Sequence, residues 1–106
     1  MKIRHLALAA AGAALLAGGA HAQTRGVSKT EVQIGTIQDL SGPIAAYGKA
    51  ARNGIQLRFD EVNEQGGLHG RRLKLHAEDS GYDPKKGVLA AQKLAQSDKV
   101  FLVAGS

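Results

Sequence analysis

The segment from Asp39 to Gly48 gathers the side chains of this chain that are best placed to hold a small ligand. It puts a hydroxyl, a glycine and a phenol where a predicted strand passes into a predicted helix. Free amides and the positive end of the helix dipole at such a turn attract a carboxylate. A second interpretation stays open, because Ser41 could cap the turn locally and Tyr47 could pack as an anchor at the start of the helix.

The glycines of the chain do not form a nucleotide-binding loop. Five residues separate Gly42 from Gly48, and Ala50 stands where a phosphate-binding loop needs a serine or threonine for magnesium. The later cluster from Gly66 to Gly70 misses the dinucleotide spacing and leads into a predicted strand rather than a helix. The sequence therefore predicts no cofactor.

Metal-ligating and acid-base residues are also poorly grouped. His69 and His76 have no cysteine or spaced carboxylate beside them to complete a metal site, so we expect both to be solvated surface side chains. The acidic group of Glu78, Asp79 and Asp83 is denser, but Asp83 fits a helix cap and the other two end a strand. With no serine at a recognisable nucleophile turn, the sequence predicts neither a metal site nor an enzyme.

The charge pattern argues against a nucleic-acid partner. Lysine and arginine number 14 against 9 acidic residues, for a net charge of +5. Lys2 and Arg4 carry two of these charges, so the chain beyond its first 22 residues has a net charge of +3. The four Tyr and Phe side chains stand singly, whereas nucleic-acid binders interleave aromatics with a basic stripe.

Residues 1–22 have the pattern of a secretory signal peptide. Lys2 and Arg4 give a positive start, and a run of about a dozen apolar or small residues follows, which is short for the roughly 20 residues of a membrane span. An Ala-His-Ala tripeptide ends at Ala22, which predicts cleavage there and Gln23 as the new N-terminus. We therefore expect export without a stable membrane anchor.

The first half of the remaining chain predicts a strand and a helix. Residues 23–30 lack any period and suggest a flexible lead-in, and Glu31–Ile37 alternates as a short strand does. Tyr47–Glu64 predicts a helix that ends at Gly66. Its expected buried stripe consists of Ala51, Ile55, Phe59 and Val62.

The second half repeats this order. Arg71–Asp79 alternates strictly, which is typical of a strand with one wet face or at a sheet edge. Asp83 and Pro84 predict the start of a helix that runs to about Gln96. Its expected buried residues are Val88, Ala91 and Ala95, helped by Leu94. Val100–Ala104 is continuously apolar, as a strand covered on both faces would be.

Strands alternating with helices predict an α/β fold with a doubly wound parallel sheet. If the half-wet second strand is outermost and the apolar third strand is interior, the first strand lies between them, in the order 2-1-3. Ligands of such sheets bind beyond the carboxyl ends of the strands, where the winding reverses. Here that crevice lies between the loop from Asp39 to Gly48 and whatever follows Gly105 and Ser106.

An ordered series of short motifs then resembles the leucine-binding-protein-like group of type I periplasmic substrate-binding proteins of ABC transporters. The motifs are Val32-Gln33-Ile34-Gly35, Leu40-Ser41-Gly42-Pro43, Tyr47-Gly48, Asn53-Gly54, Glu61-Val62-Asn63, Gly66-Gly67-Leu68-His69-Gly70-Arg71, Glu78-Asp79, Asp83-Pro84 and Val103-Ala104-Gly105-Ser106. The resemblance implies a periplasmic binding lobe, with residues 31–106 as the start of its N-terminal lobe. It also implies that Ser41, Gly42, Pro43, Tyr47 and Ser106 line the ligand cleft.

The same resemblance implies a function in transport. Members close two lobes on a small polar ligand and deliver it to an inner-membrane permease and ATPase. The implied ligands are branched-chain amino acids, although relatives take amides, urea or aromatic acids. Two lobes of about 150 residues each exceed this chain, so we expect a truncated fragment.

Two other functions stay open at this point. The same lobe serves as the ligand-sensing domain of receptors and regulators, which a downstream membrane span or kinase segment would favour. A small flavodoxin-like enzyme would need a phosphate loop or a catalytic set, and the sequence has neither.

Overall fold

The computed structural model describes residues 24–106. The predicted signal peptide and the predicted cleavage site at Ala22 and Gln23 lie outside the described residues. None of the helices in the described part combines the length and apolarity that a membrane crossing requires.

A parallel three-stranded sheet forms the centre of the described chain. Its strands are β1 (Glu31–Gln38), β2 (Arg72–Asp79) and β3 (Leu102–Val103), in the order β2-β1-β3. The register places Ile34 of β1 between Leu75 and Leu102. The predicted α/β class and the 2-1-3 order are therefore confirmed, and the carboxyl ends of all three strands meet at one edge.

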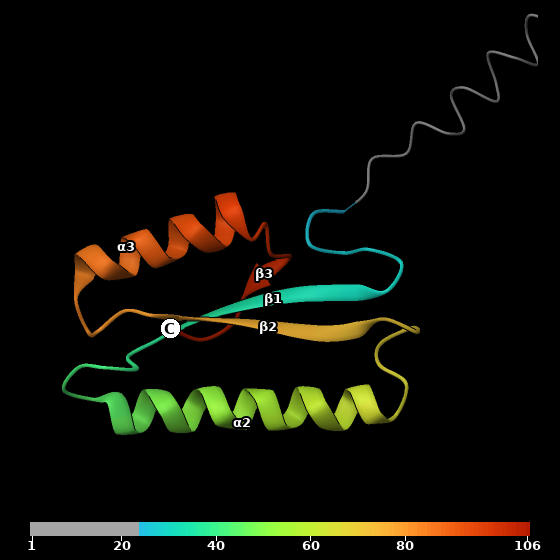
Figure 1. The fold of residues 1–106 in the computed structure, drawn as a ribbon, viewed down its shortest axis with the longest axis horizontal. Helices are drawn as coiled ribbons and strands as arrows, with labels where there is room; N and C mark the ends of the chain where they lie inside the picture. The colour runs from blue at the N-terminus through green and yellow to red at the C-terminus, as the bar shows by residue number, and fades with distance from the viewer. Residues whose placement is uncertain (1–23) are drawn as a thin grey trace, which may run out of the picture.

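Helices cover both faces of this sheet. Figure 1 shows α2 (Ala45–Glu64) along one face and α3 (Pro84–Gln92) along the other, as double winding requires. A π-helical turn, η1 (Lys93–Ser97), continues α3. Asp83 caps α3 as predicted, because its carboxylate accepts from the Lys86 amide and Pro84 takes the first helical position.

Buried apolar side chains lie on both faces of the sheet, with Ala90 of α3 and Leu94 of η1 on one face and Leu73 on the other, toward α2. Leu94 is fully buried, and Ala90, Leu73 and Val100 are nearly so. Leu94 packs directly over Gly35 of β1, where an added Cβ would lie 2.9 Å from its Cδ1 atom. A larger residue at that strand position would push α3 off the sheet.

The buried face predicted for the second helix is confirmed at Leu94 and wrong at Val88, Ala91 and Ala95. Ala90 and Leu94 turn toward the sheet, while Val88 is 57% exposed and Ala91 and Ala95 are also exposed. Both stripes are apolar, so periodicity alone could not separate them. Side-chain size does not decide the rotation either, because Leu89 is as large as Leu94 and is 64% exposed; the packing of Leu94 over Gly35 distinguishes the two.

The predicted third strand is longer and more buried than the observed one. Only Leu102 and Val103 form β3, and they are 43% and 46% exposed. Val100, by contrast, is buried. Among the described residues β1 is the only partner of β3, so its outer edge has no neighbouring strand to cover it.

The residues before β1 are bound to the sheet, which differs from the predicted flexible lead-in. Val27 pairs with Val32, and the carbonyl of Gly26 accepts from the Gln33 amide at 2.8 Å. An added Cβ on Gly26 would overlap the backbone of Phe101, so this segment lies directly against the approach to β3.

One of the two predicted surface histidines is partly enclosed. His69 is exposed, but the His76 side chain is only 18% exposed and its Nε2 atom lies 2.8 Å from the side-chain oxygen of Gln33. Beside it, Lys93 joins β2 to η1 through Glu78 at 2.8 Å and Asp98 at 2.9 Å. The hydrogen bond from Lys93 to Glu78, and to a smaller extent the one to Asp98, raises the pKa of Lys93.

Candidate functional site

Asp39 organises the turn that follows β1. Its side chain is 5% exposed and accepts from the backbone amides of Ser41 at 3.1 Å, Gly42 at 2.5 Å and Ile44 at 2.9 Å. These bonds satisfy the buried carboxylate and fix the path of the chain into α2. The sequence-based prediction missed this role, although an aspartate two residues before a Ser-Gly pair is a known signal for such turns.

Asp79 joins this turn to the loop after β2. Its carboxylate accepts from the Ser41 hydroxyl at 2.5 Å, from the Leu40 amide at 2.9 Å and from the Gly81 amide at 2.8 Å. The Ser41 hydroxyl, followed by the two amides, lowers the pKa of Asp79 from 3.8 to about 2. The two loops therefore form one connected rim at the carboxyl ends of the strands.

Two glycines allow the close packing of this rim. A Cβ on Gly48 would lie 1.8 Å from the carbonyl oxygen of Asp39, and one on Gly42 would lie 2.4 Å from that of Gly81. Both contacts are to backbone, which cannot rotate out of the way. Gly42 and Gly48 are thus required by the shape of the turn.

The first turn of α2 leaves Tyr47 free. Its ring is 78% exposed, so it does not pack as an anchor at the start of the helix. Ser41 does not cap α2 either, because Ile44 holds the cap position and the Ser41 hydroxyl donates to Asp79. Pro43 is exposed between them. Within residues 24–106, Ser41 therefore links the two loops and does not cap α2, and the Tyr47 ring is largely exposed.

Ser106 lies in a hollow of about 470 Å³ between the end of β1 and the start of α3. It is the one predicted site residue among those that line this hollow, which Ile37, Tyr82 and Pro84 also border. The carbonyl of Gly105 accepts from the Ile37 amide and the Thr36 hydroxyl, both at 3.3 Å, and so holds the segment beside β1.

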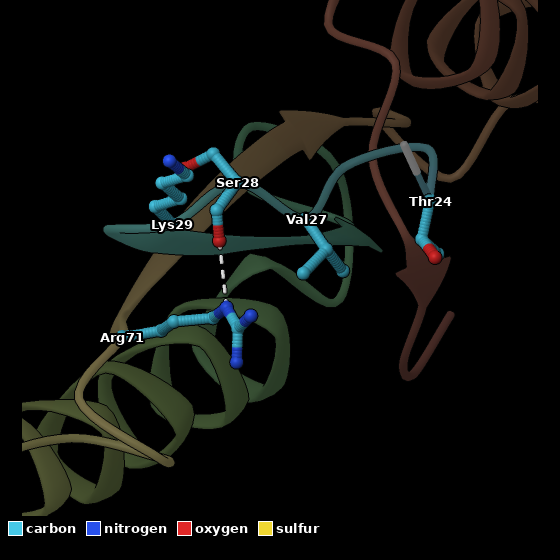
Figure 2. A pocket seen from close by; sticks show the side chains of 5 residues that line it. All are labelled: Thr24, Val27, Ser28, Lys29 and Arg71. Carbon is cyan, nitrogen blue, oxygen red and sulfur yellow. Dashed lines mark hydrogen bonds between the residues drawn. The ribbon is translucent and has the colours of Figure 1, made fainter. Parts of the chain in front are cut away.

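A second hollow lies at the opposite end of the sheet. Figure 2 shows it bordered by Thr24, Val27 and Arg71, and the Nε atom of Arg71 donates to the carbonyl of Ser28 at 2.6 Å. Its volume is about 240 Å³, half that of the Ser106 hollow. Because Ser28 precedes β1 and Arg71 precedes β2, this hollow is at the amino ends of the strands, away from the predicted site.

Several groups at the carboxyl ends of the strands are placed where they could contact a small molecule. Asp39 and Asp79 are both occupied by amide and hydroxyl donors, so neither is poised as a base. Within residues 24–106 no group of three or more His, Asp or Glu side chains could hold a metal ion. The same edge of the sheet also has an exposed phenol at Tyr47, a hydroxyl at Ser106 and the largely apolar hollow that Ser106 borders.

Comparison with known families decides the ancestry of this fold. A family model described as periplasmic binding protein matches residues 31–106. The chain belongs to the periplasmic binding protein family. The match contains every element of the sheet, both helices and all five predicted site residues.

Curated relatives place the chain near the leucine-binding proteins. It is 39% identical over 77 residues to the Leu/Ile/Val-binding protein BraC3 of Rhizobium johnstonii, covering 73% of this chain and 21% of that protein. It is 33% identical over 92 residues to Leu/Ile/Val-binding protein homolog 3 of Brucella melitensis, covering 84% of this chain and 25% of the relative. The chain thus spans between a fifth and a quarter of these relatives.

Solved structures show the same fold with different ligands named. The branched-chain amino acid binding protein LivJ of Streptococcus pneumoniae, in complex with isoleucine, matches with a TM-score of 0.69 at 31% identity, over 73% of this chain and 22% of that one. A fatty acid ABC transporter substrate-binding protein from Thermomonospora curvata also matches with a TM-score of 0.69, at 33% identity, over 77% and 21%.

Proposed function

We propose that this chain provides the first part of the ligand-binding lobe of an extracytoplasmic solute-binding protein, which delivers a small solute to the inner-membrane permease of an ABC transporter. The observation that carries the proposal is the connected rim at the carboxyl ends of the strands. In doubly wound sheets this is the edge where ligands bind. Family membership supports a solute-binding lobe, because the family model matches residues 31–106.

The ligand class follows from what the named relatives have in common. Isoleucine and fatty acids differ in size and in the amino group, but each combines a carboxylate with an aliphatic portion. Ser106 offers a hydroxyl, while Tyr47 offers an exposed ring. We therefore propose a small carboxylate or amide with an apolar side chain, with the branched-chain amino acids first among them.

Export through the predicted signal peptide belongs to the same proposal. A solute-binding protein that serves an inner-membrane permease works in the periplasm, and residues 1–22 have the charge, length and cleavage pattern of a secretory leader. The proposed partners are the solute and the permease.

Calorimetric titration of the full-length product of this gene tests the proposal. We expect L-leucine, L-isoleucine or octanoate to bind with a dissociation constant of about 10 μM or tighter, and glucose not to bind. A steric pair of variants locates the site. Ser106→Trp should fill the hollow at the carboxyl ends and weaken binding by about tenfold or more. Thr24→Trp, in the hollow at the amino ends, should leave affinity unchanged.

Three results would count against the proposal. Binding of glucose alone would contradict the ligand class. Equal affinity in the Ser106→Trp variant and the wild type would contradict the location. Loss of binding in the Thr24→Trp variant with retention in Ser106→Trp would place the site at the opposite end of the sheet.

A receptor function is the second candidate. An extracellular ligand-binding receptor from Verminephrobacter eiseniae shares the fold, with a TM-score of 0.62 at 26% identity over 72% of this chain and 21% of that one. Solute uptake separates the two functions. A transport protein is required for uptake of its ligand, so deletion of the gene should slow that uptake, whereas deletion of a receptor should change the response and leave uptake intact.

A further inference from the structure

The loop between β2 and α3 holds a tyrosine in an unusual backbone conformation. Gly81 and Tyr82 both have a φ of +57°, and the Asp83 amide donates to the carbonyl of Ser80 at 2.9 Å. Positive φ at both central residues is the pattern of a type I′ turn, in which glycine and asparagine are the favoured residues. The turn therefore does not need a tyrosine, and its backbone disfavours one.

Local hydrogen bonds keep this turn in place. The Ser80 hydroxyl accepts from the Tyr82 amide at 3.2 Å, and the Asp79 carboxylate accepts from the Gly81 amide. Because Asp79 also binds Ser41 and Leu40, the position of Tyr82 is coupled to the turn after β1. These bonds fix the backbone from which the Tyr82 ring projects.

The ring itself is not used for packing within the described residues. Tyr82 is 65% exposed, yet it borders the hollow that contains Ser106. Ile37 and Pro84 supply the other apolar surfaces of that hollow. A strained residue whose large side chain stands at a hollow, and not in the core, is often explained by a contact made with a ligand.

We propose that Tyr82 is a specificity-determining residue, whose ring binds the apolar side chain of the solute together with Ile37 and Pro84. Tyr47 begins α2 and Tyr82 precedes α3, and these helices cover opposite faces of the sheet (Figure 1). The two residues thus belong to segments that lead into helices on opposite faces of the sheet. Tyr82 selects for the size and apolarity of the solute. This inference rests on the proposed function.

Two pairs of probes isolate the apolar contact. L-leucine and L-alanine differ only in side-chain size, as do octanoate and acetate in chain length. Calorimetry on the full-length gene product measures the affinity for each probe. The quantity of interest is the affinity for the larger probe divided by that for the smaller probe, in whichever pair binds. Tyr82→Gly removes the ring and suits a φ of +57°, so we expect the turn to survive and the melting temperature to stay equal or rise. Tyr82→Phe keeps the ring.

The expected result is a change of preference rather than a general loss. Tyr82→Gly should lower the ratio by about fivefold or more, through weaker binding of the larger probe alone, and Tyr82→Phe should keep the ratio within about twofold of the wild type. An unchanged ratio in Tyr82→Gly would overturn the inference and leave the proposed function standing. Equal weakening of both probes would also overturn it, since that would indicate a structural role. If the wild type binds neither pair, the proposed ligand class and this inference both fail.

Discussion

The contact between Gly48 and Asp39 gives the sharpest structural prediction. Alanine at position 48 would place its Cβ 1.8 Å from the Asp39 carbonyl oxygen. Since an unstrained carbon-to-oxygen contact is about 3.3 Å, the turn and the helix would have to separate by about 1.5 Å. The Asp39 hydrogen bonds to Gly42 and Ile44 depend on that spacing.

The expected cost can be worked out from these contacts. Overpacking usually destabilises by about 1–3 kcal/mol, and the upper end applies here because backbone meets backbone. The higher helix propensity of alanine offsets about 1 kcal/mol of this destabilisation. We therefore expect Gly48→Ala to lower the free energy of unfolding by about 2 kcal/mol.

A matched control lies in the same helix. Gly54 has no atom within 4 Å of its added Cβ, so Gly54→Ala should raise the free energy of unfolding by about 0.5–1 kcal/mol. Urea unfolding of both variants of the full-length gene product, followed by circular dichroism, measures the difference. Equal stability of the two variants would refute the close approach between Asp39 and Gly48.

Three further predictions concern binding, pH and export. Tyr47→Ala should raise the dissociation constant for the cognate solute by about tenfold or more while leaving the melting temperature of the ligand-free protein unchanged, and an unchanged affinity in calorimetry would contradict this. The pKa of Asp79 is lowered from 3.8 to about 2. Its carboxylate therefore contributes fully to stability above pH 3.8, and this contribution is lost as the pH falls toward 2. The stability difference between wild type and Asp79→Asn should shrink over that range in urea titrations, and a constant difference would oppose it. Mass spectrometry of the periplasmic fraction should find Gln23 at the N-terminus, and recovery of only the uncleaved chain in membranes would oppose export.

Much of the architecture could be predicted because it depends on local patterns. The strict alternation of Arg71–Asp79 identified an edge strand, and that gave the strand order. Asp83 and Pro84 gave the start of α3 through a cap that involves only neighbouring residues. Such features need no knowledge of the rest of the fold.

Other features depend on contacts between distant parts of the chain. The rotation of α3 was mispredicted because Val88, Ala91 and Ala95 form as regular a stripe as the buried one, and only the packing of Leu94 on Gly35 separates them. β3 was expected to be covered on both faces because its sequence is continuously apolar. Apolar composition does not say which neighbouring segments pack against a strand.

The candidate site shows the same division. The segment containing Ser41 and Tyr47 was identified from residue types and the strand-to-helix position. The roles of Asp39 and Asp79 were not, because each carboxylate acts by binding amides of a turn whose shape the sequence does not display. Asp39 is buried and Asp79 is exposed, and hydrophobic periodicity distinguishes neither role.

A crystal structure of the full-length gene product with L-isoleucine tests the central claim most directly. We expect the amino acid at the carboxyl ends of the strands, with its carboxylate within hydrogen-bond reach of Ser106 and its side chain against Tyr47 or Tyr82. Isoleucine bound instead in the hollow between Thr24 and Arg71, or no bound isoleucine at saturating concentration, would contradict the account.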